Sequence, residues 1–573
     1  MRRFLSRAAR PPASVGTLIG VGALLAVVAY LLLPPLGTLV LGAITDSPPA
    51  TPLHFTPATL RLAYGQADIY PALVNSLIFA GFTATIVLAL GLGLAWIVER
   101  TDARVRLMTD LLVLAPIVMP AVLLVNGWIM LLSPRSGVIN LMARDWFGLA
   151  TPPFDIFSFP GMVWIAVLQE LPLAFLWLWP SFRAMNPELE EAGMTCGAGI
   201  LTVIRRVTLP MLRPTILGAW TIFFIYALGA LSVPLLVGEP AKIFLYSTQI
   251  YRAATQMPTD LNIASAYSLL FLVVSVIGIW LHFRFTRDGD RFATIRGRAF
   301  RPRRFELGRA RLGVEAAVAI VLLFVGILPF LVLLWNAFMP FPQAPSLASI
   351  HLLGLKNFTA AWDYGPAQRA FRNSLLLGAA SGVAATLLGA AIAWCNMRVG
   401  RYRRLIALMD QLAATPVALP GLVVGMGLTW FYLEVPLPIY GTPIILFLAY
   451  VTLHLPYAVR ICSSGLAQLH PELEEAARAA GASQGVVLAR IVFALVAPSL
   501  LASTLYVLLR SFREYTASIF LAGPGLEVFS VLVLDMSQSG NTNILAAYTV
   551  IVACVMLVIG VLFNRVEKKI GLR

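Results

Sequence analysis

Long apolar runs dominate this chain of 573 residues. A helix needs about 20 apolar residues to cross roughly 30 Å of hydrocarbon. Twelve runs approach or exceed that length, at residues 17–44, 73–98, 108–132, 161–180, 214–237, 264–285, 313–338, 373–395, 405–433, 442–462, 498–521 and 544–563. The alternating pattern of barrel strands is absent, and a bilayer otherwise admits only helices. The sequence therefore predicts an all-α polytopic membrane protein with about twelve transmembrane helices.

The composition excludes a soluble multi-domain enzyme. Hydrophobic residues make up 59% of the chain and charged residues only 12%, whereas a soluble domain is about a quarter charged. Lys and Arg number 42 against 27 Asp and Glu, an excess that in a soluble protein would suggest nucleic acid. In a membrane protein we interpret it as an orientation signal, and we expect lipid but no nucleic acid as a partner. The isolated Cys196, Cys395, Cys462 and Cys554 are interpreted as core residues.

The basic residues fall mainly on one side of the predicted membrane. One set of segments comprises the N-terminal arm, 99–107, 182–213, 284–311, 397–404, 464–497 and the C-terminal tail, and it carries 31 Lys and Arg. The opposite set comprises 44–72, 133–159, 238–262, 339–372, 433–440 and 523–541, and it carries 8. Cytoplasmic loops are the ones enriched in Lys and Arg. We therefore predict that both termini and segment 284–311 are cytoplasmic.

The two halves of the chain repeat one another. Asn75-Ser76-Leu77 recurs as Asn373-Ser374-Leu375, and Pro-Glu-Leu-Glu-Glu-Ala occurs both from Pro187 and from Pro471. We predict a first six-span unit at 1–286, a basic cytoplasmic linker at 287–311 and a second six-span unit at 312–573. Because both units have the same orientation, they form a parallel repeat about an axis along the membrane normal. Such a repeat predicts a pathway between the two halves.

Two polar loops, 187–210 and 471–494, occupy equivalent places in the repeat. Each begins with proline and a run of glutamates and reaches a glycine six residues after the second adjacent glutamate. Proline and carboxylates favour a helix start, and the glycine allows a sharp turn. We predict a short exposed helix suited to docking into a dimeric partner, with a plain connecting loop as the alternative.

These loops resemble the Glu-Ala-Ala-x3-Gly-x9-Ile-x-Leu-Pro loop of permease subunits of binding-protein-dependent ABC importers with the type I fold. The first loop matches at Glu191-Ala192-Gly193, Gly197, Val207 and Leu209-Pro210. The second matches at Glu475-Ala476-Ala477, Gly481 and Ile491, but has Phe493-Ala494 in place of Leu-Pro. The fused form is most similar to the ferric-iron permease family, which also contains thiamine permeases.

The resemblance implies a type I ABC importer permease fold in a bacterial inner membrane. It implies that a coupling helix in each loop docks on a homodimeric ABC ATPase, which would bind ATP and Mg. An extracytoplasmic binding protein would deliver ferric iron or a small organic solute such as thiamine, a polyamine or a phosphonate. The coupling residues that it implies are Glu190, Glu191, Ala192, Gly197, Glu474, Glu475, Ala476, Ala477 and Gly481.

No catalytic motif is found in the sequence. A Walker A loop, GxxxxGK[ST], places Lys before Ser or Thr, and none of Lys242, Lys356, Lys568 and Lys569 does so. There is no HExxH motif and no close His/Cys cluster. We therefore predict a transport subunit that is not an enzyme, binds no cofactor or metal ion of its own, and depends on a partner for ATP hydrolysis.

Polar and kinking residues inside the spans are candidates for the pathway. Glu170 and His454 are repeat mates that could form a midplane pair or bond locally. Arg510 and Glu514 have the i, i+4 spacing of a self-neutralising pair. Together with Arg513 they could favour an anion or a metal–anion complex, or form a packing network. The remaining candidates are the helix-kinking prolines Pro116, Pro120, Pro416 and Pro420.

A duplicated membrane fold does not by itself define the energy source. The main alternative is therefore a proton-coupled secondary transporter that uses Glu170, His454 or Glu514. Such a carrier has no need of a docking loop, so the paired glutamate loops favour the importer. A membrane enzyme is excluded by the lack of an acid, base or metal constellation.

Overall fold

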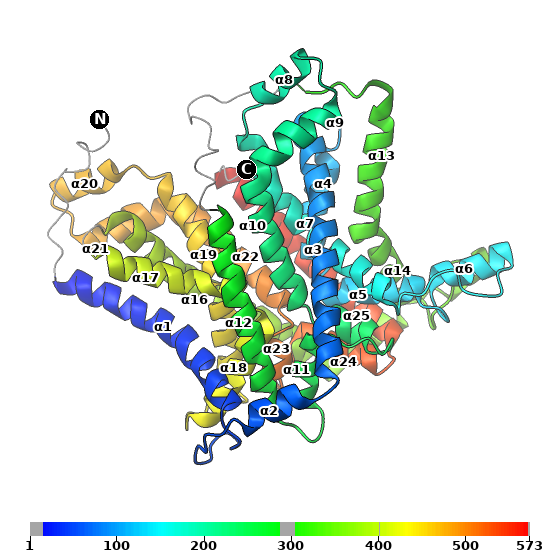
Figure 1. The fold of residues 1–573 in the computed structure, drawn as a ribbon, viewed down its shortest axis with the longest axis horizontal. Coiled ribbons are helices and arrows are strands. Elements are labelled where there is room, and N and C mark those ends of the chain that lie inside the picture. The colour runs from blue at the N-terminus through cyan, green and yellow to red at the C-terminus, as the bar shows by residue number, and fades with distance from the viewer. Residues whose placement is uncertain (1–14, 287–303, 400–401, 571–573) are drawn as a thin grey trace. The chain divides into compact units, whose positions relative to one another are not determined.

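The computed structural model describes residues 15–286, 304–399 and 402–570 (Figure 1). Regular structure in these ranges is helical, apart from two isolated β-bridges. Ten of the helices in these ranges are long and apolar enough to cross a membrane. The predicted all-α polytopic fold class is confirmed. The N-terminal arm and linker residues 287–303, which we predict to be cytoplasmic, lie outside the described residues.

The chain divides into two compact units. Unit 1 comprises residues 1–57, 368–531 and 556–573, and unit 2 comprises 58–367 and 532–555. Unit 2 contains α2 (Ala58–Gly65), α3 (Ile69–Arg100), α4 (Arg106–Val118), α5 (Ala121–Leu132), α6 (Val138–Phe147), α7 (Phe159–Ala184), α8 (Glu188–Thr195), α9 (Ile200–Val203), α10 (Leu209–Leu228), α11 (Tyr246–Thr255), α12 (Leu261–Thr286), α13 (Arg311–Leu322), α14 (Leu328–Phe338) and α15 (Lys356–Asp363).

Unit 1 is built from the first helix of the chain and most of its second half. It contains α1 (Val15–Ala43), most of α16 (Gly365–Arg398), α17 (Arg403–Ala414), α18 (Gly421–Glu434), α19 (Pro443–Ala467), α20 (Pro471–Ala479), α21 (Gln484–Val487), α22 (Phe493–Arg513) and α23 (Ser518–Leu521). Both α24 (Phe529–Gln538) and α25 (Thr542–Ile570) begin in one unit and end in the other.

Each half of the sequence contributes its first span to the other half's unit. In unit 1, α1 packs on α18, where a Cβ built on Gly427 would lie 2.6 Å from the carbonyl oxygen of Pro35. In unit 2, α14 packs on α5, where a Cβ on Gly127 would lie 2.8 Å from the Cβ of Pro329. The two glycines are repeat mates, 300 positions apart. The units are therefore built alike, and neither coincides with one half of the sequence.

The predicted spans at 108–132 and 405–433 are each broken, at Pro120 and at Pro420, two of the prolines that the sequence predicts to kink them. Helix α4 ends at Val118 and α5 begins after Pro120, while α18 begins after Pro420. Segments Arg403–Val417 and Gly421–Glu434 meet at 109°. Proline lacks an N–H group and clashes with the preceding turn of a helix. The described residues thus contain ten continuous spans, or eleven with this bent pair, rather than twelve.

Two other predicted spans end earlier than expected. Helix α10 ends at Leu228 rather than at residue 237, and α22 ends at Arg513 rather than at residue 521. A separate π-helical turn, Pro234–Gly238, follows the first. After the second, the Glu514 carboxylate accepts hydrogen bonds from the Thr516 hydroxyl at 2.8 Å and the Ala517 N–H at 2.9 Å. These bonds stabilise a turn where the apolar run alone predicts a continuing helix.

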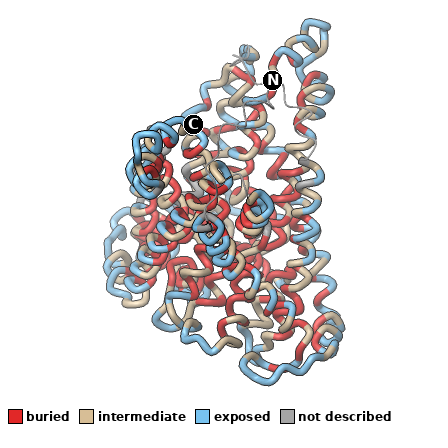
Figure 2. The backbone as a smooth tube through the Cα atoms, turned by 90° about the vertical axis from the view of Figure 1, so that its left-hand side faces the viewer, coloured by how far each residue is buried: buried red, intermediate tan, exposed pale blue. Residues whose placement is uncertain are grey.

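The same close helix contact occurs in both units. Helix α3 packs on α7 through Gly91, whose Cβ would lie 3.1 Å from the Ala174 Cβ. Helix α16 meets α19 at Gly389, whose Cβ would lie 2.8 Å from backbone atoms of Ala458 and Val459. Without large side chains at these points the backbones can approach closely. Buried and exposed residues alternate along the long helices (Figure 2).

The repeated Asn-Ser pair fixes a short helix in each copy. The hydroxyl of Ser76 accepts a hydrogen bond from the Tyr246 N–H at 2.7 Å, at the first residue of α11. Ser374 does the same for the Phe529 N–H at 2.8 Å, at the start of α24. Beside this contact Arg369 bonds Glu527 and lowers the pKa of that carboxyl below its ordinary value. The repeat therefore extends to polar contacts.

Candidate functional site

The first polar loop folds as a short helix that is held by a buried ion pair. In α8 the Glu190 carboxylate lies 2.6 Å from the Arg100 Nε, and both side chains are at most 3% exposed. The Arg100 Nη2 also donates to the carbonyl oxygens of Phe182 and Met185 at 3.1 and 3.3 Å. Arg100 therefore joins the end of α3, the end of α7 and α8.

The second loop is held in the same way. In α20 the Glu474 carboxylate lies 2.7 Å from the Arg398 Nε, with side chains 9% and 14% exposed. The Arg398 Nη2 donates to the carbonyl oxygen of Leu469 at 3.0 Å. Leu469 and Met185 each stand five residues before the paired glutamate. A buried charge is tolerated when it is paired and hydrogen-bonded, and both copies meet that condition.

A glycine ends each short helix in the left-handed conformation. Gly197 has φ +84° and Gly481 has φ +86°. Both glycine N–H groups donate to a carbonyl three residues earlier, and the next residue bonds five residues back in both copies. This is the helix-ending geometry that favours glycine. The short helix and the sharp turn that the sequence predicts are thus present twice.

Each short helix also presents an exposed face. We call this the docking face: Leu189 and Ala192 with the half-buried Glu191 on α8, and Leu473, Glu475 and Ala476 on α20. Leu189 is 45% exposed and Leu473 is 48% exposed. Glu190 and Glu474, which the sequence groups with these residues, instead turn inward to their arginines. Ala477 is half-buried.

The two loops leave through matching turns but with different side-chain contacts. Each passes through a five-residue π-helical turn, Ile204–Thr208 or Leu488–Val492, into α10 or α22. In the first copy the Thr208 hydroxyl donates to the Glu190 carboxylate at 2.5 Å. In the second copy the equivalent residue is Val492, which cannot donate. Although the second loop lacks the Leu-Pro pair, both loops leave through the same kind of π-helical turn, so the path of the chain is alike in the two copies.

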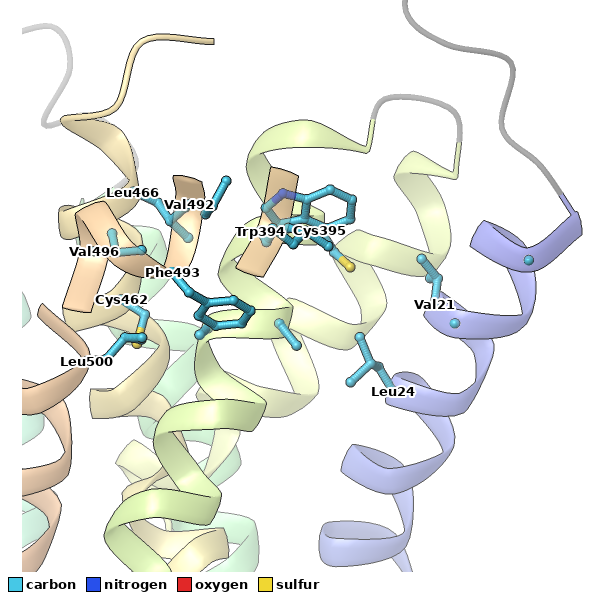
Figure 3. Close-up of a pocket in the computed structure, with 15 residues that line it drawn as sticks. Val21, Leu24, Trp394, Cys395, Cys462, Leu466, Val492, Phe493, Val496 and Leu500 are labelled. Carbon is cyan, nitrogen blue, oxygen red and sulfur yellow. The ribbon is translucent and has the colours of Figure 1, made fainter. Parts of the chain in front are cut away.

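A cavity of about 440 Å³ lies beneath the exit of the second loop (Figure 3). Its walls come from α1, α16, α19 and the start of α22, with Val21, Trp394, Cys462 and Phe493 among them. Phe493 stands where the first copy has Leu209. The lining side chains are almost all apolar, so the cavity provides packing space next to the loop and no catalytic group.

The sequence did not identify the arginines that hold the loops. Arg100 and Arg398 are 298 positions apart, the same spacing as Asn75 and Asn373. Extending the repeat alignment from the asparagine pair to the end of its helix would have found them. Each is the last residue of a membrane-spanning helix. An arginine in that position is ordinarily interpreted as a charge at the cytoplasmic boundary, so the sequence gives no sign that it pairs with a glutamate of the loop.

The pathway candidates are distributed over both units. Glu170 lies on α7 of unit 2, half-buried, and His454 lies on α19 of unit 1, 1% exposed. Their pairing stays a prediction. Pro120 and Pro420 immediately precede α5 and α18. Pro116 lies within α4, and Pro416 lies in a 3₁₀ turn after α17.

Arg510, Arg513 and Glu514 do not share one helix face. Glu514 follows the last residue of α22, and its carboxylate serves the turn described above. Arg510 instead lies over the ring of Tyr457, 5.0 Å from its centre, and its Nη2 donates to the Tyr457 hydroxyl at 3.4 Å. The i, i+4 arrangement expected for Arg510 and Glu514 is therefore wrong, because the helix ends before it is completed.

Comparison with known proteins identifies the repeated unit. The profile of the family "Binding-protein-dependent transport system inner membrane component" matches residues 85–288 and again 385–572. The ferric transport system permease protein FbpB of Actinobacillus pleuropneumoniae is 24% identical over 513 residues, which cover 89% of this chain and 73% of that protein. A putative 2-aminoethylphosphonate transport system permease protein PhnV of Salmonella typhimurium is 26% identical over 46% of this chain and 97% of its own length.

A solved bacterial ABC transporter involved in the import of the acidic polysaccharide alginate covers 46% of this chain and 92% of its own, with TM-score 0.36 and 19% identity. The two profile matches together span more than half of the chain, one in each half. Ten apolar spans agree with an inner-membrane multi-pass protein. The chain belongs to the family of binding-protein-dependent transport system inner membrane components, as a permease of an ABC importer with two fused copies of the family domain.

Proposed function

We propose that this permease is driven by a homodimeric ABC ATPase that docks on α8 and α20. The observation that carries the proposal is the duplicated ion pair, because Arg100–Glu190 and Arg398–Glu474 fix both short helices to membrane-spanning helices. Because each short helix is fixed to membrane-spanning helices on its inner side, a partner that moves its outer side would also move those helices. Two equivalent helices suit a partner with two equivalent clefts.

The docking face supplies contacts of the kind that such a partner needs. An exposed leucine next to glutamate and alanine is present on both helices. Apolar anchors within a polar rim are typical of protein interfaces. We place both faces and both termini in the cytoplasm because 31 basic residues lie in the segments on that side and 8 on the other. ATP and Mg would be bound by the partner.

We further propose that an extracytoplasmic binding protein delivers the solute to the opposite side. Segments 133–159, 238–262 and 339–372, which belong to the less basic set, would receive it. The relatives named above suggest ferric iron or a phosphonate. Thiamine or a polyamine is the other kind of cargo within the proposed range. Alternating access between the two sides would move the solute to the cytoplasm.

The test of docking changes the exposed leucines only. A variant with Leu189→Asp and Leu473→Asp is expected to lose copurification of the partner ABC ATPase. It should also lose at least about 90% of permease-stimulated ATP hydrolysis, because a charge at an apolar anchor opposes desolvation. The matched control is Leu62→Asp, at a residue 59% exposed in the opposite segment set and outside the segments proposed to receive the solute. It should retain both activities. Copurification that survives the double substitution would contradict docking at this face.

A further inference from the structure

The segment before α13 is fixed to the end of α3 in unit 2. The Phe305 N–H donates to the Arg100 carbonyl oxygen at 2.8 Å, and the Phe305 carbonyl oxygen accepts from the Asp102 N–H at 3.1 Å. The ring centre of Phe305 lies 5.8 Å from that of Trp96, one turn before Arg100 on α3. Phe305 therefore contacts the helix end from which Arg100 holds α8.

The N-terminal arm repeats the sequence of this segment. Residues 2–10 read Arg-Arg-Phe-Leu-Ser-Arg-Ala-Ala-Arg and residues 303–311 read Arg-Arg-Phe-Glu-Leu-Gly-Arg-Ala-Arg, so five of nine positions are identical. Phe4 is thus the counterpart of Phe305, and each precedes the first span of its half. The arm, residues 1–14, lies outside the described residues. The repeat therefore includes the segment that precedes each first span.

The counterpart of Trp96 is Trp394, which lines the cavity of unit 1. The two tryptophans are 298 positions apart, the spacing that also relates the two loop-holding arginines. Trp394 lies between Val21 of α1 and Phe493 of α22 among the lining side chains (Figure 3). Its buried indole N–H has no hydrogen-bond partner within the described ranges, although a buried indole N–H usually has one. The tryptophan that Phe305 contacts in unit 2 thus faces a cavity in unit 1.

Smaller side chains give the cavity its volume of about 440 Å³. On α19 it is lined by Cys462 and Leu466, where the first copy has the larger Leu178 and Phe182 on α7. Protein interiors are close-packed and contain few voids larger than a water molecule. A space of this size next to a tryptophan therefore suits an additional apolar side chain.

The N-terminal arm is long enough to bring Phe4 to Trp394. Phe4 stands eleven positions before the start of α1 at Val15, and Gly16 on that helix already lines the cavity. An extended chain covers about 3.3–3.6 Å per residue, so these positions span more than the six that separate Phe305 from the start of α13. Chain length thus permits in unit 1 the contact that is formed in unit 2.

We propose that the N-terminal arm docks in the cavity of unit 1 with the Phe4 ring on Trp394, as Phe305 lies on Trp96 in unit 2. The occupant of the cavity is then a segment of this chain. Burial of the aromatic ring stabilises the docked arm, because apolar surface is removed from water. The arginines beside Phe4 stay on the predicted cytoplasmic side, as do those beside Phe305.

A docked arm would brace the second short helix. Leu488 and Val492, in the π-helical turn through which the second loop leaves, line the cavity. Arg398 follows Trp394 by one helical turn on α16 and holds α20 through Glu474. Filling the cavity therefore restricts both the exit of the loop and the helix end that anchors it.

Cysteine crosslinking in the full-length permease tests the contact. In a chain whose four native cysteines are replaced by alanine, Phe4→Cys is combined with Trp394→Cys. The reference pair is Phe305→Cys with Trp96→Cys. With a short bismaleimide the first pair should crosslink at least about half as efficiently as the reference pair, because docking gives the two thiols a high effective concentration. A crosslink in the reference pair alone would overturn the proposal.

Hydrogen exchange separates the two short helices. Phe4→Ser should raise the exchange rate of α20 amides at least about fivefold and leave α8 unchanged, because the loss of the ring opens a cavity only beside the second loop. Phe305→Ser should have the reverse effect. The matched control is Leu5→Ser, which should change neither helix, since the counterpart of Leu5 is the exposed Glu306.

The same measurement distinguishes the arm from a lipid chain as the occupant of the cavity. Identical exchange of α20 in Phe4→Ser and Leu5→Ser would contradict docking of the arm, and it is the result expected if an acyl chain of a membrane lipid fills the space. Phe4→Trp keeps an aromatic ring and should behave like the parent chain. Because the permease is measured alone, these results do not depend on whether an ATPase docks on α8 and α20.

Discussion

Replacing Arg100 with alanine is expected to destabilise the permease by about 3–5 kcal/mol, because it leaves Glu190 buried without its partner. The two side chains are 2% and 3% exposed. Thermal unfolding in detergent measures the loss, and hydrogen exchange in α8 localises it. The matched control is Arg183→Ala, which removes an exposed arginine on the same predicted side of the membrane and should change stability by less than about 0.5 kcal/mol.

The second ion pair provides a graded comparison. Arg398 and Glu474 are 14% and 9% exposed. Water can therefore solvate the unpaired Glu474 carboxylate better than that of Glu190, and Arg398→Ala should cost less stability than Arg100→Ala. A double variant, Arg100→Met with Glu190→Leu, removes both charges and should recover much of the stability. Equal behaviour of Arg100→Ala and Arg183→Ala would show that the ion pair does not hold the loop.

Replacing Gly389 with alanine is expected to cost at least about 1–3 kcal/mol through overpacking. The added Cβ would lie 2.8 Å from backbone atoms of Ala458 and Val459, which cannot rotate away. The measurement is the amount of folded, monodisperse protein together with its melting temperature. Gly37→Ala, on α1 with nothing within 4 Å of the added atom, serves as the control and should be neutral or slightly stabilising.

The first copy again gives a milder case. At Gly91 the nearest atoms are the Cβ of Ala174 at 3.1 Å and a Leu178 methyl at 3.2 Å. Small shifts relieve these contacts, so Gly91→Ala should destabilise less than Gly389→Ala. If Gly389→Ala behaves like Gly37→Ala, then α16 and α19 do not approach at this glycine.

Apolar runs and polar repeats were sufficient to predict the fold class and the family. Run length identifies membrane-spanning helices because the bilayer leaves no other way to satisfy the backbone. The matching loops pointed to the importer permease family, because polar residues that recur in two exposed loops are not explained by helix packing. The short helix and the glycine turn followed from local chemistry at Pro187 and Gly197, where neighbouring residues decide the conformation.

Contacts between distant segments were beyond such reasoning. Pro120 and Pro420 predict kinks, but hydropathy does not show that the helices end there, because the residues on both sides stay apolar. The end of α22 at Arg513 depends on hydrogen bonds of the Glu514 carboxylate within the following turn. The exchange of α1 and α14 between the two halves depends on which helix faces Gly127 and Gly427, and no periodicity within one helix contains that information.

The division of the adjacent glutamates also required the structure. The sequence groups Glu190 with Glu191, and Glu474 with Glu475, as coupling residues. The structure turns the first of each pair toward an arginine and leaves the second nearer the surface. The coupling roles of Glu191, Glu475 and their neighbours remain our proposal, and the ion pairs suggest that Glu190 and Glu474 act by holding the helix in place.

Uptake into proteoliposomes tests the central claim most directly. The permease is reconstituted with its ATPase, and the solute is supplied outside with the binding protein. We expect uptake that requires ATP on the side of the basic segments, requires the binding protein on the other side, and persists when an ionophore collapses the proton gradient. Uptake that needs no ATP and stops with the ionophore would contradict the account and indicate a proton-coupled carrier that uses Glu170, His454 or Glu514.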